Sequence, residues 1–199
     1  MDVISSPGVA AREAPSEGAG TECASLSIAL AGSGGSGVMT AGTLLLDAAA
    51  RAGLYGLMVR TSGPQIRGGE AAGLLRIGRT PLESLDDRFD LLLAIDWLNI
   101  NRFADEIPLH PGSLLLGDAD SGSAPEVFLA TGTRSVSLPL KKMVKTIPGS
   151  WINMAALGVA GAMGVGLKRL FVQSGHVALE VNANGEVRFI LHRVEDVTE

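Results

Sequence analysis

The sequence of 199 residues contains a single cysteine, Cys23. One cysteine excludes a disulfide framework within the chain, and it excludes an iron–sulfur cluster whose cysteine ligands all come from this chain. Scarce cysteine also fits a reducing compartment, so we expect the protein to be cytoplasmic. Hydrophobic residues make up 46% of the sequence and charged residues 19%, which is typical of one globular domain.

The sequence has no excess of positive charge. Its formal net charge is -5 and its isoelectric point is about 5.2. Binding to nucleic acid requires a basic face, so we expect no nucleic-acid partner.

No hydrophobic run is well suited to a membrane. The longest apolar tract, Trp151–Leu167, contains Asn153 and four glycines. It is shorter than the roughly 20 apolar residues that a transmembrane helix needs. We therefore expect no membrane span, and we predict a buried helix over Trp151–Met163. Residues 1–24 lack the basic start and apolar core of a secretory signal, and we expect a mobile N-terminal extension there.

Familiar catalytic and metal-binding patterns are also missing. The three histidines, His110, His176 and His192, lie in different segments without metal-ligand spacing. No serine is paired with an obvious histidine in a nucleophile motif, and Gly37 is followed by Val38 rather than by the lysine of a P-loop. We therefore predict no catalytic residue and no metal ligand in this chain.

A glycine-rich loop is the most informative feature that is present. The loop consists of Gly32, Ser33, Gly34, Gly35, Ser36 and Gly37. It lies between a predicted strand, Ser25–Ala31, and a predicted helix, Val38–Ala52. Bare N–H groups at the start of a helix attract anions, usually the phosphates of a nucleotide-type ligand. The alternative is a tight turn that only packs the helix against the strand.

A second unusual loop covers Gly63–Glu70. Gly63-Pro64 indicates a turn, and Arg67 is followed directly by Gly68 and Gly69. An arginine in such a loop can bind a phosphate or a carboxylate through its planar fork. The alternative is that Arg67 pairs with Glu70 or lies in solvent.

Two further polar residues are candidates for ligand contact. Asp96 ends the apolar run Phe89–Ile95, and the carboxyl ends of such strands are where α/β folds place ligands. Asp96 equally suits the N-cap of a predicted helix over Trp97–Glu106. Asn153 lies in the first turn of an apolar helix, where its side chain bonds either a ligand or a neighbouring loop.

The order of these segments predicts a three-layer α/β/α domain over residues 25–166. Its sheet is mixed but mostly parallel, with a Rossmann-like glycine loop after the first strand. The second and third strands, Leu54–Thr61 and Ala71–Ile77, are too close in sequence for a crossover helix, so we expect them to be antiparallel. Ser25–Ala31 and Phe89–Ile95 are predicted to be the central strands.

Shorter extended pieces follow in the second half of the chain. The pattern predicts them at Ser113–Leu116, Val127–Ala130 and Ser135–Leu138. Residues 167–199 form an atypical C-terminal segment. Within it we predict a β-hairpin of Val177–Val181 and Val187–Leu191.

With these segments in order, the chain resembles the gamma subunit, or gamma domain, of 2-oxoacid:ferredoxin oxidoreductases. The resemblance covers roughly Ser25 to Gly164. It is carried by Ile28–Gly42 (IALAGSGGSGVMTAG), Arg60–Gly69 (RTSGPQIRGG), Leu75–Ile77 before Pro81-Leu82, Phe89–Asp96 (FDLLLAID) and Asn153–Gly158 (NMAALG).

The resemblance implies a subunit of an enzyme that oxidatively decarboxylates a 2-oxoacid, such as pyruvate or 2-oxoglutarate, to an acyl-CoA. It implies that thiamine diphosphate and iron–sulfur clusters are held by alpha- and beta-type partner subunits, and that electrons leave to ferredoxin. The gamma part is implied to contribute to coenzyme A binding and subunit packing, and the isolated chain is expected to be inactive. The glycine loop and Arg67 suit the phosphates of coenzyme A.

Three residues differ from those usual in this family. Ser36 replaces Gln, Gln65 replaces Glu, and Glu70 replaces a small Ser or Thr. An acid next to Gly69 repels a phosphate unless Arg67 neutralises it.

Two other functions remain open from the sequence. A stand-alone dinucleotide-binding protein needs an acid about 20 residues past the glycine loop, where this chain has Arg60 instead. A non-catalytic assembly module with a vestigial site needs no further motif. Co-purification with thiamine-binding partners separates the enzyme subunit from the assembly module.

Overall fold

The computed structural model of this chain describes residues 25–63, 69–146, 151–162, 176–181 and 187–192. The predicted N-terminal extension, Arg67 and Gly68 lie outside these described residues.

Six strands form one mixed sheet in the order β2-β3-β1-β4-β5-β6. The strands are β1 (Ser25–Ser33), β2 (Tyr55–Ser62), β3 (Glu70–Gly78), β4 (Phe89–Ala94), β5 (Leu109–Asp118) and β6 (Arg134–Leu138). β1, β4, β5 and β6 run parallel, whereas β3 is antiparallel to both β1 and β2. The predicted mixed, mostly parallel sheet is therefore confirmed, with β1 and β4 at its centre.

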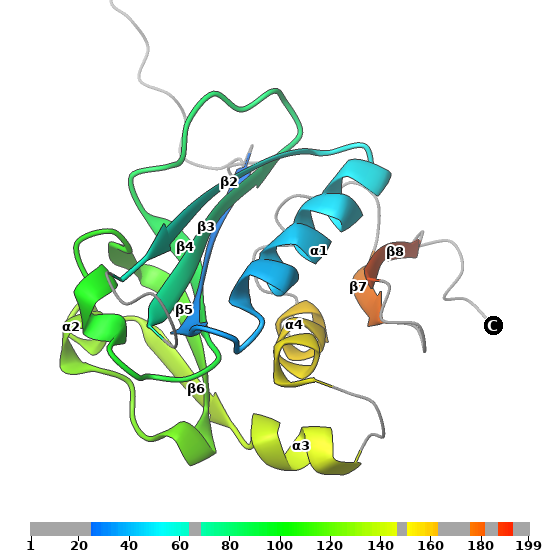
Figure 1. Cartoon of the computed structure of the whole chain (residues 1–199). Coiled ribbons are helices and arrows are strands. Elements are labelled where there is room, and N and C mark those ends of the chain that lie inside the picture. The colour runs from blue at the N-terminus through cyan, green and yellow to red at the C-terminus, as the bar shows by residue number, and fades with distance from the viewer. Residues whose placement is uncertain (1–24, 64–68, 147–150, 163–175, 182–186, 193–199) are drawn as a thin grey trace, which may run out of the picture.

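Helices cover both faces of the sheet, which confirms the α/β fold class (Figure 1). The helices are α1 (Val38–Arg51), η1 (Ile100–Phe103), η2 (Ala119–Ser121), α2 (Glu126–Leu129), α3 (Leu140–Thr146) and α4 (Ile152–Ala162). α1 and α4 lie together on one face. The opposite face is covered by the short η1 and α2 and by the segments around them, so the second helical layer is thin.

Alternation along the buried strands explains the two cores. Successive side chains of a strand point to opposite faces. Ile28 and Leu30 therefore pack under α1 and α4, whereas Ala29 and Ala31 belong to the other core, which contains Phe103.

Several sequence predictions are corrected by the structure. The helix expected over Trp97–Glu106 is only the single 3-10 turn of η1, because Asn99 adopts a left-handed backbone conformation (φ 56°), as asparagine does more readily than most residues. The extended piece expected at Val127–Ala130 is the helix α2, which Pro125 precedes and Glu126 favours by placing an acid in the first turn.

Two further differences concern α3 and β5. α3 gave no periodic signal because, of its residues Leu140–Lys145, only Leu140 is buried. β5 is longer than the predicted Ser113–Leu116, and it joins β4 past an irregularity between Phe89 and Leu91.

The predicted hairpin is present as β7 (His176–Val181) and β8 (Val187–His192), which pair antiparallel. β7 contacts α4 and β8 contacts α1. Among the described residues, no helix has the length and apolar character needed to cross a membrane.

Candidate ligand-binding cleft

The glycine loop joins β1 to α1 as predicted, and its last residue can only be glycine. Gly37 precedes the helix in a left-handed conformation (φ 87°), and no side chain caps the helix start. A Cβ atom on Gly37 would lie 2.4 Å from the side-chain Nδ2 of Asn153. Gly35 is also left-handed (φ 91°), but a Cβ atom there would meet nothing within 4 Å.

Asn153 binds this loop, which is one of the two roles its sequence position allowed. Its side chain is buried, and its Nδ2 donates to the carbonyl of Gly37 at 3.1 Å. Its Oδ1 accepts from the N–H of Met154 at 3.0 Å. Asn153, which belongs to α4, therefore holds in place the residue that precedes α1.

Asp96 holds the other end of the loop. Its Oδ2 accepts from the backbone N–H of Ser33 at 2.9 Å and from the Ser33 hydroxyl at 2.7 Å. Its Oδ1 accepts from the N–H of Leu98 at 3.0 Å. Asp96 therefore closes a turn and anchors the glycine loop, and it does not cap the helix that the sequence suggested.

The second predicted loop returns to the same place. The N–H of Gly34 donates to the carbonyl of Gly69 at 2.5 Å, and Ser33 is paired with Glu70 in the β1–β3 register. Gly69 therefore lies against the glycine loop. Glu70 is neutralised by a residue that the sequence did not indicate, Arg102, whose Nη1 lies 2.5 Å from Oε1 of Glu70.

An open cleft of about 640 Å³ adjoins the glycine loop. It lies at the carboxyl ends of the parallel strands, where α/β folds bind ligands. Its lining consists of Ser33, Ser36, Ile95, Asp96, Trp97, Leu98, Ser121, Lys141 and Ile152. Of the residues predicted for the site, Ser33, Ser36 and Asp96 therefore line one cleft, whereas the glycines of the loop are not part of its lining. Asn153 lies behind the loop.

Sequence reasoning missed two polar residues of the cleft lining, Ser121 and Lys141, and the buried Asp118 that bonds both of them. Asp118 ends β5 as Asp96 follows β4, and that repeated position was the available signal. Burial raises the pKa of Asp118, but hydrogen bonds from the Lys141 backbone and the Ser121 hydroxyl, with the Lys141 charge, lower it more. The net result is a pKa below the usual value, so Asp118 is a carboxylate at neutral pH.

No cluster of three or more metal-binding side chains occurs in the part of the chain that the structure describes. The cleft combines serine hydroxyls, one lysine and one carboxylate with apolar walls. Such a surface suits binding of a polar organic ligand.

Comparison with protein families identifies one match across most of the chain. The model described as pyruvate ferredoxin/flavodoxin oxidoreductase matches residues 27–185. The ketoisovalerate oxidoreductase subunit VorA of Methanothermobacter thermautotrophicus is 27% identical over 165 residues, which are 82% of this chain and 33% of that protein. This chain thus spans about a third of that relative's length.

Three solved structures share the fold. A 2-oxoglutarate:ferredoxin oxidoreductase from Magnetococcus marinus, with 2-oxoglutarate, coenzyme A and succinyl-CoA bound, matches with a TM-score of 0.58 and 24% identity, over 75% of this chain and 26% of that chain. The gamma subunit of a keto/oxoacid ferredoxin oxidoreductase from Geobacter sulfurreducens matches with a TM-score of 0.55 and 21% identity, over 74% of this chain and 79% of that chain. The pyruvate oxidoreductase subunit PORC of Thermotoga maritima matches with a TM-score of 0.55 and 18% identity, over 76% of this chain and 84% of that chain.

Proposed function

We propose that this chain, which belongs to the pyruvate ferredoxin/flavodoxin oxidoreductase family, is the gamma-type subunit of a 2-oxoacid:ferredoxin oxidoreductase. The enzyme converts a 2-oxoacid and coenzyme A to an acyl-CoA and CO₂, with release of one proton and two electrons that pass to ferredoxin. The proposal is supported by the fold, which covers 79% of the Geobacter sulfurreducens gamma subunit and 84% of the Thermotoga maritima subunit PORC.

The role of this chain in that reaction is to bind coenzyme A and to pack against its partners. The phosphates contact the glycine loop Gly32–Gly37, through the N–H groups of Gly35 and Gly37 that are not bonded within it, and the guanidinium of Arg67, which precedes Gly68 and Gly69 in the sequence. The observation that supports this best is the hydrogen bond from Gly34 to Gly69, which brings both loops together. Within the described residues, the N–H groups of Gly35 and Gly37 have no acceptor, so they are free to bind an anion.

Thiamine diphosphate and the iron–sulfur clusters belong to alpha- and beta-type partner subunits in this proposal. One cysteine cannot supply the ligands of a cluster. The isolated chain therefore does not oxidise a 2-oxoacid, and it acts in the cytoplasm within the assembled enzyme. Mass spectrometry of the native complex tests this assignment, because an assembly module or a stand-alone dinucleotide-binding protein would not bring thiamine-binding partners with it.

Kinetics of the assembled enzyme with coenzyme A as the varied substrate test the binding role. Charge-assisted hydrogen bonds contribute about 1.5–3 kcal/mol, so Arg67→Ala should weaken coenzyme A use by roughly 10- to 150-fold. Arg67→Lys should restore only part of the loss, because an ammonium lacks the bidentate fork. Decarboxylation of the 2-oxoacid on thiamine diphosphate should change much less, since that step does not require coenzyme A.

Arg51→Ala is the matched control, because Arg51 is an exposed arginine at the opposite end of α1 from the loop. It should leave the kinetics with coenzyme A unchanged. Equal kinetics for Arg67→Ala and Arg51→Ala would contradict the proposed role of Arg67.

A further inference from the structure

Lys141 is held at the edge of the cleft by a buried carboxylate. Asp118 is fully buried and accepts hydrogen bonds from the Ser121 hydroxyl at 2.9 Å and from the Lys141 N–H at 3.2 Å. The Lys141 ammonium lies 2.8 Å from the Ser121 hydroxyl and 3.4 Å from Oδ2 of Asp118. Its side chain is 48% exposed, so the ammonium is positioned but still accessible.

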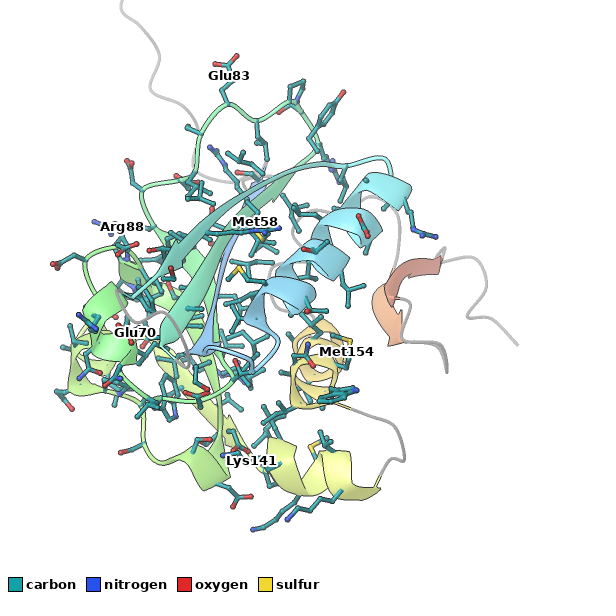
Figure 2. The ribbon with its side chains drawn as sticks, in the orientation of Figure 1. Met58, Glu70, Glu83, Arg88, Lys141 and Met154 are labelled. Atoms are coloured by element: carbon teal, nitrogen blue, oxygen red, sulfur yellow. The ribbon has the colours of Figure 1, made fainter. Side chains whose placement is uncertain are left out.

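The parallel strands place this group opposite the glycine loop. β4 lies between β1 and β5, and all three run in the same direction. The glycine loop follows β1, Asp96 follows β4, and Asp118 ends β5. Lys141 lies at the start of α3 (Figure 2). It lines the same cleft as Ser33 and Ser36.

Donors outnumber free acceptors in this cleft. Both oxygens of Asp96 already accept hydrogen bonds, from Ser33 and from Leu98. The Ser36 hydroxyl and the Trp97 indole N–H, which are buried in the cleft wall, have no partner in the described part of the chain. The ammonium of Lys141 has three protons and uses two on Ser121 and Asp118.

An acceptor-rich anion matches this set of groups better than a cation or a neutral sugar does. Two charged side chains, Asp96 and Lys141, are in the cleft lining. The Asp96 charge faces three donors from the chain itself, which reduces its repulsion of a ligand. Lys141 thus keeps one ammonium proton for an anionic ligand, whereas three of the roughly four acceptor positions of Asp96 are already used.

We propose that Lys141 is a second phosphate contact, which binds a different phosphate of the same coenzyme A molecule from the glycine loop. The inference rests on the proposed function. It adds a contact beside β5, which is separated from the glycine loop after β1 by the strand β4. Coenzyme A carries a diphosphate and a separate 3′-phosphate, so one ligand can engage both positions. Asp118 is then a positioning residue, which acts on the ligand only through Lys141 and Ser121.

The neighbouring lysine offers a matched control. Lys142 is 72% exposed, pairs with Asp120 at 3.2 Å, and is not part of the cleft lining. Lys141→Gln and Lys142→Gln remove the same charge from adjacent positions of α3. Both keep the backbone N–H of residue 141 that bonds Asp118, and thermal unfolding of both variants verifies that they fold.

The experiment is calorimetric titration of the full chain, and of the assembled enzyme, with coenzyme A, dephospho-coenzyme A and pantetheine. Lys141→Gln should weaken coenzyme A binding by about 10- to 100-fold, whereas Lys142→Gln should change it by no more than about twofold. Pantetheine has no phosphate, so Lys141→Gln should not weaken its binding. Loss with coenzyme A alone identifies the 3′-phosphate, and loss with dephospho-coenzyme A as well identifies the diphosphate.

The other outcomes separate the two proposals. If Arg67→Ala weakens coenzyme A binding but Lys141→Gln behaves like Lys142→Gln, the contact from Lys141 is wrong and the proposed function stands. An equal loss for pantetheine would also overturn the contact, because the effect would then not involve phosphate. If neither the wild-type chain nor the assembled enzyme binds coenzyme A, both proposals fail.

Discussion

Arg102 and Glu70 form an ion pair that joins η1 to the first residue of β3, with Nη1 of Arg102 2.5 Å from Oε1 of Glu70. The Glu70 side chain is 1% exposed and that of Arg102 is 51% exposed. Glu70 lies on the side of the sheet away from α1, next to Gly69 (Figure 2). Arg102 therefore neutralises an acid that, within the described part of the chain, has no other ion-pair partner.

Arg102→Ala should destabilise the chain, because the buried carboxylate of Glu70 would lose its ion-pair partner. The expected loss in unfolding free energy is about 1–3 kcal/mol, measured by urea denaturation. The double variant Glu70→Ala with Arg102→Ala should recover part of that loss, since it removes the buried charge as well. A double variant that is as unstable as the sum of the two single variants would show that they do not interact.

Gly37→Ala should be more damaging than Gly35→Ala, although both residues are left-handed. Gly35→Ala introduces only backbone strain of about 1–2 kcal/mol, because the site is open. Gly37→Ala adds a clash with Asn153. Combining it with Asn153→Ala should restore stability relative to the sum of the single changes. Strict additivity in urea denaturation would contradict this close approach.

Asp118→Asn should lower stability at neutral pH and alter its dependence on acid. The pKa of Asp118 is lowered in the folded chain from 3.8, so its stabilising contribution is complete above that value. The contribution is lost as the pH falls through the lower folded pKa. The difference in unfolding free energy between wild type and Asp118→Asn should therefore be largest near neutral pH and shrink below about pH 4. A difference that is independent of pH would contradict the prediction.

Asp96→Asn should weaken coenzyme A binding by loosening the glycine loop, because an amide has one acceptor oxygen and cannot accept from Ser33 and from Leu98 at the same time. Asp90→Asn is its matched control. Asp90 lies at the other end of β4 and accepts from the N–H of Ser27 at 2.9 Å, as Asp96 accepts from Ser33. Both variants should lose about 1–2 kcal/mol of stability, but only Asp96→Asn should raise the KM for coenzyme A. An equal effect of the two variants on KM would contradict this role of Asp96.

The sheet could be predicted from the sequence because its central strands are buried on both faces. Ser25–Ala31 and Phe89–Ile95 are nearly unbroken apolar runs, and the short connection after the second strand required an antiparallel pair. α2 and α3 could not be predicted, since such short helices depend on a few buried contacts and have little periodicity. In the segment after Asp96, the left-handed Asn99 ended a pattern that otherwise suited a helix.

The candidate site was predictable where backbone conformation dictates composition. Glycine and serine in a strand-to-helix turn located the loop, and Asp96 followed from the end of a buried strand. The partners of these residues were not predictable, because they come from distant positions. The pairing of Arg102 with Glu70 and of Lys141 with Asp118 depends on how η1 and α3 dock, which no local pattern encodes.

The hydrogen bond from Gly34 to Gly69 also makes one amide a reporter of loop opening. An amide hydrogen that is bonded within the protein exchanges with deuterium only when that bond opens. The protection of the Gly34 amide therefore reports how often this bond between the glycine loop and Gly69 is open, whereas the amides of Gly35 and Gly37 are free of that restraint within the described structure. Exchange at this single position follows the motion of the cleft wall without any ligand, substrate or electron acceptor in the sample.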